Sequence, residues 1–558
     1  MRAALQQPGE MSEKPARRQS GLSQLAWVAI PVLIAALVLA PIVSVLSIAL
    51  FPKENIWPHL ISTSLPRYVG NTLVLMCGIG VLAGAIGTGA AWLVTRYSFP
   101  LRRWLEWLLL LPLAIPAYVG AFALVDFLEY AGPIQTALRQ VFGWTSSQDY
   151  WFPEIRSMGA AILVLSGALY PYVFLLSRAA FREQSAACDE VARSLGASPF
   201  ERFWRVGLPL ARPAIAAGVA IAMMEAVNDF GTVDFFAVQT LTTGIFTTWL
   251  EAGNAGGAAQ IACVVLAMVV CLVLVERASR SKMRFFNQSR GHRGISRINL
   301  TGLRAWLAML ACLLPFLFAF VLPVGVLLSH AWDEVGIWRN DALWRAVANT
   351  LTVGGAAAVV TVTAGLLMVY GARLTKHRLP VVLIPVTSIG YAAPGAVLGV
   401  GILIPLAWLD NRVADGILAV TGRDIGLVMT GTGFALILAY AVRFFAIAQG
   451  AADAGMGRIS PNLQYAARSL GRTRSQVLRA VYIPLMKGTI ASALLLVFVD
   501  CMKELPATLL LRPFNYNTLA TLVYNEASLE NISGAAPAAL MIVGVGLIAV
   551  LLLARTNR

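Results

Sequence analysis

Four carboxylates lie inside apolar stretches of this 558-residue chain, where ionisable side chains are costly to place. Glu225 and Asp229 are spaced i, i+4, and Asp500 and Glu504 repeat that spacing later in the chain. This spacing puts each pair on one face of a helix. Carboxylates in such positions attract a cationic solute, hold a gate, or form structural pairs.

The chain offers no set of side chains suited to chemical turnover. Its four histidines lie in predicted loops, and we find no histidine pair, no nucleophile beside a base and no metal-ligand cluster in the sequence. The six cysteines lack paired metal spacing. There is no Gly-Lys dipeptide, hence no phosphate-binding loop of the usual type for ATP. We therefore predict that the chain is not an enzyme and binds no cofactor.

The composition is that of a membrane protein. Hydrophobic residues make up 58% of the chain and charged residues only 13%, and the mean hydropathy is +0.72, which excludes an ordinary soluble enzyme. A helix needs about 20 apolar residues to cross a bilayer. Twelve runs meet this criterion, at about 25–50, 70–94, 104–130, 158–180, 210–238, 258–275, 305–329, 349–371, 381–409, 425–442, 488–510 and 534–554.

The net charge of +15 indicates orientation in the membrane. With the N-terminus inside, 33 of the 43 Lys and Arg residues fall on the inner side and nine in outer loops. This asymmetry predicts that both termini are cytoplasmic. The densest basic stretch, Arg277 to Arg304, is interpreted as an inner-face linker near anionic lipid and not as a nucleic-acid site.

The chain contains an internal repeat. Asn71-Thr72-Leu73 recurs as Asn349-Thr350-Leu351 at an offset of 278, and Ala192 to Gly196 recurs as Ala467 to Gly471 at an offset of 275. Each copy has six spans, so the copies are parallel repeats of an all-α polytopic membrane protein. The expected divisions are a polar tail at 1–24, a first repeat at 25–276 (core about 67–276), a basic linker at 277–304 and a second repeat at 305–558 (core about 345–554).

The long loop after the fourth span predicts a helix, a glycine turn and a capped helix. Its apolar stripe consists of Cys188, Val191, Ala192 and Leu195, at the i, i+3, i+4, i+7 spacing of one helix face. Gly196 then takes the left-handed conformation that ends a helix without steric cost. Ser198 and Glu201 form a capping box, and Pro209 opens the fifth span.

The second half repeats this pattern. The stripe is Leu463, Ala466, Ala467 and Leu470, followed by Gly471, by the cap Thr473 with Gln476, and by Pro484. Because the surrounding spans have diverged while the loop pattern is present in both halves, we expect that a partner binds this shape twice.

Both loops resemble the Glu-Ala-Ala signature of permease subunits of binding-protein-dependent ABC importers. The resemblance rests on Glu190-Val191-Ala192, Gly196 and Val206 to Pro209, and again on Ala466-Ala467, Gly471 and Val481 to Pro484. It implies the type I permease fold, two copies of an ATPase subunit that hydrolyses ATP, and a solute-binding protein outside. The implied ATPase-coupling residues are Glu190, Ala192, Gly196, Ser198, Leu208, Pro209, Tyr465, Ala467, Gly471, Thr473, Ile483 and Pro484, where Tyr465 replaces the Glu of the signature.

Further stretches are similar to the fused, two-repeat permeases of ferric iron uptake in the inner membrane. They are Leu111 to Tyr118, Asn228 to Phe235 and Lys503 to Thr508. Relatives that carry thiamine, polyamines or phosphonate share the architecture, so these solutes stay open. The alternative from another class is a self-contained membrane protein: an ion-coupled carrier, a channel or an intramembrane enzyme. Such a protein would not require the capped inner helix to be present in both halves.

Two interpretations of the four buried carboxylates remain. In the functional one, Glu225, Asp229, Asp500 and Glu504 face a central path in the outer half of the membrane and form an acidic lining or gate. In the structural one, Lys503 pairs with Asp500, and carboxylates cap irregular backbone beside Gly231 and Pro506.

Overall fold

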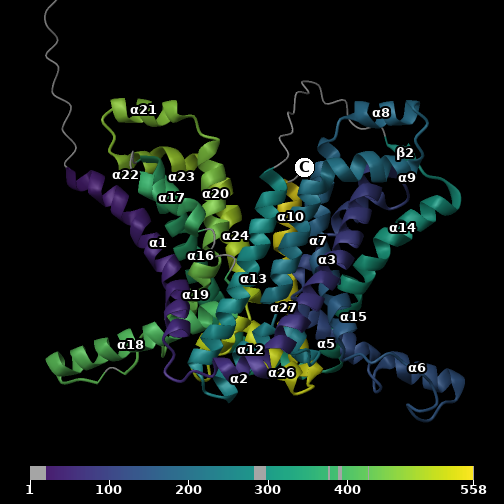
Figure 1. Cartoon of the computed structure of the whole chain (residues 1–558), viewed down its shortest axis with the longest axis horizontal. Helices are drawn as coiled ribbons and strands as arrows, with labels where there is room; N and C mark the ends of the chain where they lie inside the picture. The colour runs from purple at the N-terminus through teal and green to yellow at the C-terminus, as the bar shows by residue number, and fades with distance from the viewer. Residues whose placement is uncertain (1–20, 282–296, 375–377, 388–392, 425, 557–558) are drawn as a thin grey trace, which may run out of the picture.

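The computed structural model describes residues 21–281, 297–374, 378–387, 393–424 and 426–556, and these are almost entirely helical (Figure 1). Within this part, nine helices are long and apolar enough to cross a membrane, and up to twelve spans result if each of three bent pairs counts as one. The prediction of an all-α membrane protein with about twelve spans is thus confirmed. Most of the predicted tail and linker, residues 1–20 and 282–296, lies outside the described residues.

The unbroken spans owe their helical form to long apolar sequences whose backbone groups must bond within the segment. They are α1 (Gly21–Leu50), α3 (Leu65–Arg96), α7 (Met158–Glu183), α10 (Leu208–Asn228), α13 (Ala255–Ser281), α14 (Gly302–Phe316) with α15 (Leu322–Asp333), α16 (Asp341–Leu374), α18 (Gly395–Thr421) and α27 (Ile532–Thr556).

Three further pairs of helices are bent at a short break, and each pair is together long and apolar enough for one span. The first pair joins α4 (Arg102–Leu108) and the turn Leu111–Ala114 to α5 (Ala117–Leu128) and α6 (Pro133–Phe142), with a bend of 95° next to Pro116. The second joins α19 (Phe434–Arg443) to α20 (Phe445–Gly457) at 51°. The third joins α22 (Arg474–Val477) and α23 (Ile483–Leu485) to α24 (Lys487–Lys503) at 80°.

Several predicted span limits are wrong. The fifth span was expected to run to residue 238 and the eleventh to 510, but α10 ends at Asn228 and α24 at Lys503. In each half a short helix follows, α11 (Gly231–Phe235) or α25 (Pro506–Leu511), and then α12 (Leu241–Phe246) or α26 (Leu519–Ser528). The ninth predicted span, 381–409, covers most of α17 (Arg378–Thr387) and the first part of α18, so it joins two separate helices.

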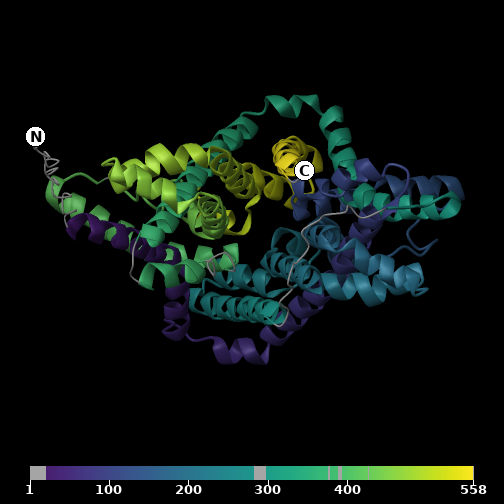
Figure 2. The ribbon, with the colours of Figure 1, turned by 90° about the horizontal axis from the view of Figure 1, so that it is seen from above.

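The first helix of each half packs against the other half. Helix α1 contacts α16, α17 and α18, besides α13 of its own half. Helices α14 and α15 contact α3, α4 and α5. Figure 2 shows the purple α1 beside the green helices of the second half. The first helix of each repeat therefore packs on the other repeat and holds the two together.

The two ends of the bundle differ. Helices α8 (Ala186–Ser194) and α21 (Pro461–Ser469) lie at one end, on opposite sides of the molecule, whereas α12 and α26 lie close together at the other end (Figure 1). Near α8, β1 (Tyr97–Ser98) pairs in parallel with β2 (Ile298–Asn299), in the register Tyr97 to Ile298. This two-residue ladder joins the first half to the chain that enters α14.

Candidate functional site

The two inner-loop motifs have the same backbone geometry. Gly196 and Gly471 take φ values of +82° and +79°, and the residue after each donates its N–H to the carbonyl five residues back, at 3.0 and 3.1 Å. A side chain at either glycine would meet open space. The requirement for glycine is thus conformational and not steric.

Both predicted capping boxes are present. Glu201 N donates to Ser198 Oγ (3.2 Å) while Ser198 N donates to Glu201 Oε2 (2.9 Å), at the start of α9 (Pro199–Arg202). In the second half Gln476 N donates to Thr473 Oγ1 (3.3 Å) and Thr473 N to Gln476 Oε1 (2.9 Å). One turn of π-helix follows in each half and leads to the next span.

The predicted coupling residues fall at matching positions of the two halves, although the second half has a bend after α23 where α10 is continuous. The exposed Glu190 lies on α8 and the exposed Tyr465 on α21. Ala192 lies on α8, Leu208 and Pro209 begin α10, Ala467 lies on α21, and Ile483 and Pro484 form α23. Large apolar side chains on these loops are exposed: Leu195 by 81%, Phe200 by 71% and Leu470 by 84%.

Each loop is tied to its half through a contact at the same position. In the first half the ring of Trp92, near the end of α3, fills the space beside Gly207, where a Cβ would collide with it. At the corresponding positions of the second half, Tyr370 packs edge-on against Tyr482, with ring centroids 5.4 Å apart. Each loop therefore packs against the second span of its half.

The structure brings all four predicted carboxylates to one cavity of about 180 Å³ between the halves. Its charged lining residues are Glu225, Asp229, Asp500, Glu504, Arg443 and Lys503. Lys503 Nζ lies 3.9 Å from Asp500 Oδ1 and donates to the carbonyl of Leu113 (2.9 Å) in the other half. The ion pair of the structural interpretation is therefore present.

Asp229 caps the short helix α11. Its Oδ1 accepts from the N–H groups of Thr232 (3.0 Å) and Val233 (3.1 Å), and its Oδ2 accepts from the Thr232 hydroxyl (2.9 Å). A carboxylate at a helix N-terminus satisfies backbone donors that no helical carbonyl reaches. This cap explains why α10 ends earlier than the hydrophobic run predicted.

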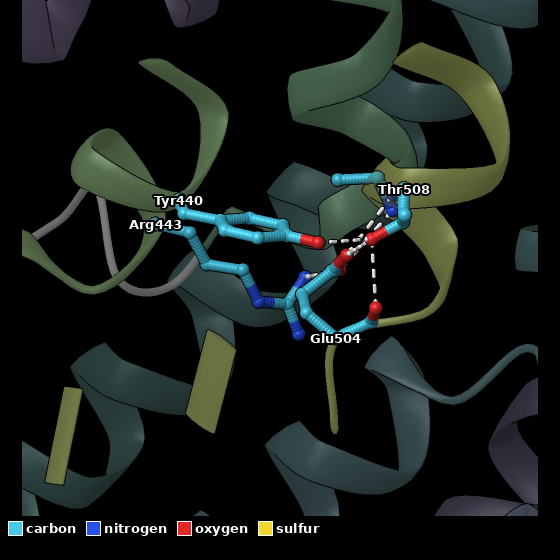
Figure 3. Close-up of polar contacts among 5 residues, drawn as sticks. Tyr440, Arg443, Glu504 and Thr508 are labelled. Atoms are coloured by element: carbon cyan, nitrogen blue, oxygen red, sulfur yellow. Dashed lines mark hydrogen bonds and ion pairs between the residues drawn. The ribbon is translucent and has the colours of Figure 1, made fainter. Parts of the chain in front are cut away.

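Glu504 performs the same task for α25 and also pairs with an arginine (Figure 3). Its two carboxylate oxygens accept from Ala507 N (3.1 Å) and from the N–H and hydroxyl of Thr508 (3.1 and 2.9 Å). Arg443 Nη1 lies 3.3 Å from Glu504 Oε1, and the Tyr440 hydroxyl lies 2.6 Å from Thr508 Oγ1. The Glu504 side chain is only 1% exposed.

The cavity is charged asymmetrically because the second half supplies both cations. Arg443 and Lys503 stand where the first half has Ala168 and Asn228, and all four residues line the cavity. Gly395 leaves the room that this requires, since a Cβ there would collide with Arg443 and Glu504.

Sequence reasoning missed Arg443 because the tenth span was expected to end at residue 442. In the structure, the bent pair α19–α20 continues past it, so Arg443 lies inside the bundle. The repeat contained the signal: at an offset of 275, Arg443 corresponds to Ala168, in the middle of α7. Within the described residues, no group of three or more His, Cys, Asp or Glu side chains is arranged to hold a metal ion.

The repeated Asn-Thr pair positions the helices that follow the cavity. Asn71 Nδ2 donates to the carbonyl of Gln239 (2.8 Å), and Leu241 N donates to Thr72 Oγ1 (3.0 Å). In the second half, Asn349 and Thr350 make the same two bonds to Asn517 and Leu519, at 2.9 and 2.8 Å. The repeat seen in the sequence is therefore a repeat of tertiary contacts.

Comparison with known proteins points to one class of transporter. The family model described as "Binding-protein-dependent transport system inner membrane component" matches residues 80–285, from within α3 past the end of α13. The Fe(3+)-transport system permease protein FbpB 2 of Haemophilus influenzae is 27% identical over 482 residues, which are 85% of this chain and 87% of that protein.

Two further relatives differ in how much of the chain they match. The ferric transport system permease protein FbpB of Actinobacillus pleuropneumoniae is 23% identical over 83% of this chain and 67% of its own length. The probable sulfate transport system permease protein cysT of Nephroselmis olivacea is 32% identical over 199 residues, which are 35% of this chain and 67% of that protein.

Proposed function

This chain belongs to the family of binding-protein-dependent transport system inner membrane components, and from that premise we propose that its ABC importer carries ferric iron. The extent of the likeness supports iron. The ferric permeases match 83–85% of the chain, hence both halves and the link between them, whereas the sulfate permease matches 35%. The solute would cross along a path between the halves that opens alternately to the two sides of the membrane, and a separate subunit would hydrolyse ATP.

We place one copy of the ATPase subunit on each inner loop. The support is that α8–α9 and α21–α22 have the same turn and the same capping geometry, with large apolar side chains exposed on both. A binding protein would deliver the solute at the opposite end, near α12 and α26. The excess of basic residues on the loop side supports cytoplasmic termini in the inner membrane.

Polar contacts between the halves close the end that faces the binding protein. Tyr524 donates to Asp234 (2.7 Å), and Arg156 pairs with Glu530 (2.8 Å). We infer that this arrangement is the inward-facing state, since α8 and α21 lie apart at the other end (Figure 1). Approach of the two ATPase copies would draw the loops together and break these outer contacts.

A deletion strain that lacks this chain should take up labelled ferric iron poorly and recover when the gene is restored. The test measures ⁵⁵Fe(III) accumulation, with unlabelled sulfate and molybdate as competitors. Iron uptake that does not depend on the chain would contradict the proposal.

An oxyanion is the second candidate solute, because Arg443 and Lys503 line the cavity and a sulfate permease is among the relatives. Chain-dependent uptake of labelled sulfate or molybdate, without uptake of iron, would favour it.

Amide substitution tests the acidic-lining hypothesis. We expect Glu225→Gln with Asp500→Asn to lower ferric uptake at least about tenfold, since the lining loses negative charge on both sides of the cavity. Membrane insertion must be confirmed by fractionation. Arg339→Gln, on an outer loop, is the control and should leave uptake unchanged. Undiminished uptake by the inserted double variant would remove the acidic-lining hypothesis and leave the structural one.

A further inference from the structure

A second cavity, lined by arginines, lies at the end of the bundle that carries α8. It has a volume of about 450 Å³ and is lined by Ser98, Phe99, Leu101, Arg102, Arg103, Trp104, Arg297 and Asn299. These residues come from β1, from the turn that follows it, from the start of α4, and from β2 with the residue before it. The cavity is separate from the central one, and neither the solute path nor the coupling loops use it.

Positive charge exceeds negative charge in this region. Glu106 is already shared by Arg102 (2.6 Å) and Arg178 (3.3 Å). Arg103 and Arg297 add further cations to the lining. Partial burial lowers the pKa of the Arg297 guanidinium, and nearby arginines, above all Arg102, lower the pKa further. An anion in the cavity would relieve this repulsion between like charges.

The surface next to the cavity is suited to acyl chains. Leu303, Trp306, Leu307 and Leu310, which follow the i, i+3, i+4, i+7 spacing of one helix face on α14, are 74%, 61%, 56% and 44% exposed. Trp104, which lines the cavity, is 68% exposed. Tryptophan is favoured where hydrocarbon meets head groups. Leu101, at the rim, holds a left-handed backbone (φ +58°), a strained conformation for leucine.

We propose that this arginine cavity binds the phosphate head group of an anionic phospholipid whose acyl chains lie along α14. A soluble phosphate would neutralise the arginines but has no apolar part to contact the exposed face of α14. A phospholipid has both a phosphate and acyl chains, so the structure favours the lipid. The bound lipid would bridge α4 of the first half and the entry to α14 of the second.

Native mass spectrometry of the full-length protein in detergent tests the proposal. Phosphatidylglycerol, phosphatidylcholine with the same acyl chains, and inorganic phosphate are titrated separately. We expect phosphatidylglycerol to bind more tightly than phosphatidylcholine. Arg103→Gln with Arg297→Gln should weaken phosphatidylglycerol binding about 30-fold, which corresponds to about 1 kcal/mol for each arginine near a charged surface.

Two further variants make the result decisive. Arg103→Lys with Arg297→Lys keeps the charge and should retain most of the binding. Arg378→Gln with Arg458→Gln removes the same charge from exposed positions elsewhere and should change nothing. Equal binding of the two lipids, or equal loss in this control, would overturn the site. Competition by inorganic phosphate at comparable concentrations would overturn the assignment to lipid.

Discussion

Replacing Gly196 or Gly471 by valine is expected to lower ATP-driven transport at least about tenfold while the protein stays inserted. Both glycines hold left-handed backbone, at φ +82° and +79°, and β-branched residues avoid this region most strongly. The cost of the conformation for an L-residue is about 1–2 kcal/mol, close to a tenfold change in an equilibrium. Each loop would lose the turn that sets its two helices for the ATPase subunit, and the double variant should lose transport altogether.

The matched controls separate the turn from the side chain. Gly196→Asn should retain most transport, since asparagine tolerates the left-handed region. Gly143→Val imposes the same backbone penalty after α6, also in open space, but outside the coupling loops, so transport should persist. The assays are co-purification of the ATPase subunit and uptake in proteoliposomes. If both survive in Gly196→Val with Gly471→Val, the loop assignment fails.

Arg443→Leu is expected to destabilise the protein by about 3 kcal/mol, because it leaves the Glu504 carboxylate buried without its cation. The estimate stands at the low end for a broken buried pair because Ala507 and Thr508 still donate to the carboxylate. Adding Glu504→Gln to Arg443→Leu should recover most of the lost free energy of unfolding, because it removes the uncompensated charge. Thermal unfolding in detergent, or unfolding by a graded denaturant, measures all three proteins.

The exposed pair Arg373–Asp453 is the control for this prediction. Its two charged atoms are closer, at 2.8 Å, but the side chains are 36% and 56% exposed. Arg373→Leu should therefore cost less than about 1 kcal/mol. A loss as large as that of Arg443→Leu, or a failure of Glu504→Gln to compensate, would contradict the view that burial gives the central pair its importance.

The inner loops were predictable from sequence because every determinant is local. A glycine five residues after Val191 and a serine three residues before Glu201 fix the turn and the cap without help from distant chain. The same turn and cap pattern recurs in the second half, which strengthens the prediction. The same holds for the number of spans, since apolar length alone determines which segments reach across a bilayer.

The central cavity was only partly predictable. Hydropathy cannot distinguish a span that continues from one that stops at a capping carboxylate, so the predicted fifth and eleventh spans end too late. Carboxylate caps beside Gly231 and Pro506 were only one of the two interpretations that the sequence supported. Arg443 lies one residue beyond the tenth predicted span, in what the sequence predicts to be a loop. Its pairing with Glu504 depends on the space at Gly395, which only tertiary structure reveals.

The exchange of first helices has a consequence for how the protein is made. Helix α1 is synthesised before the second half of the chain, yet its partners α16, α17 and α18 belong to that half. Its outward face, with Leu33 and Val43 exposed by 68% and 62%, can contact lipid before the helices of the second half are inserted. Because both halves belong to one polypeptide, their association is intramolecular. It also gives the two joined halves a single Arg443, which a pair of identical halves would carry twice or lack.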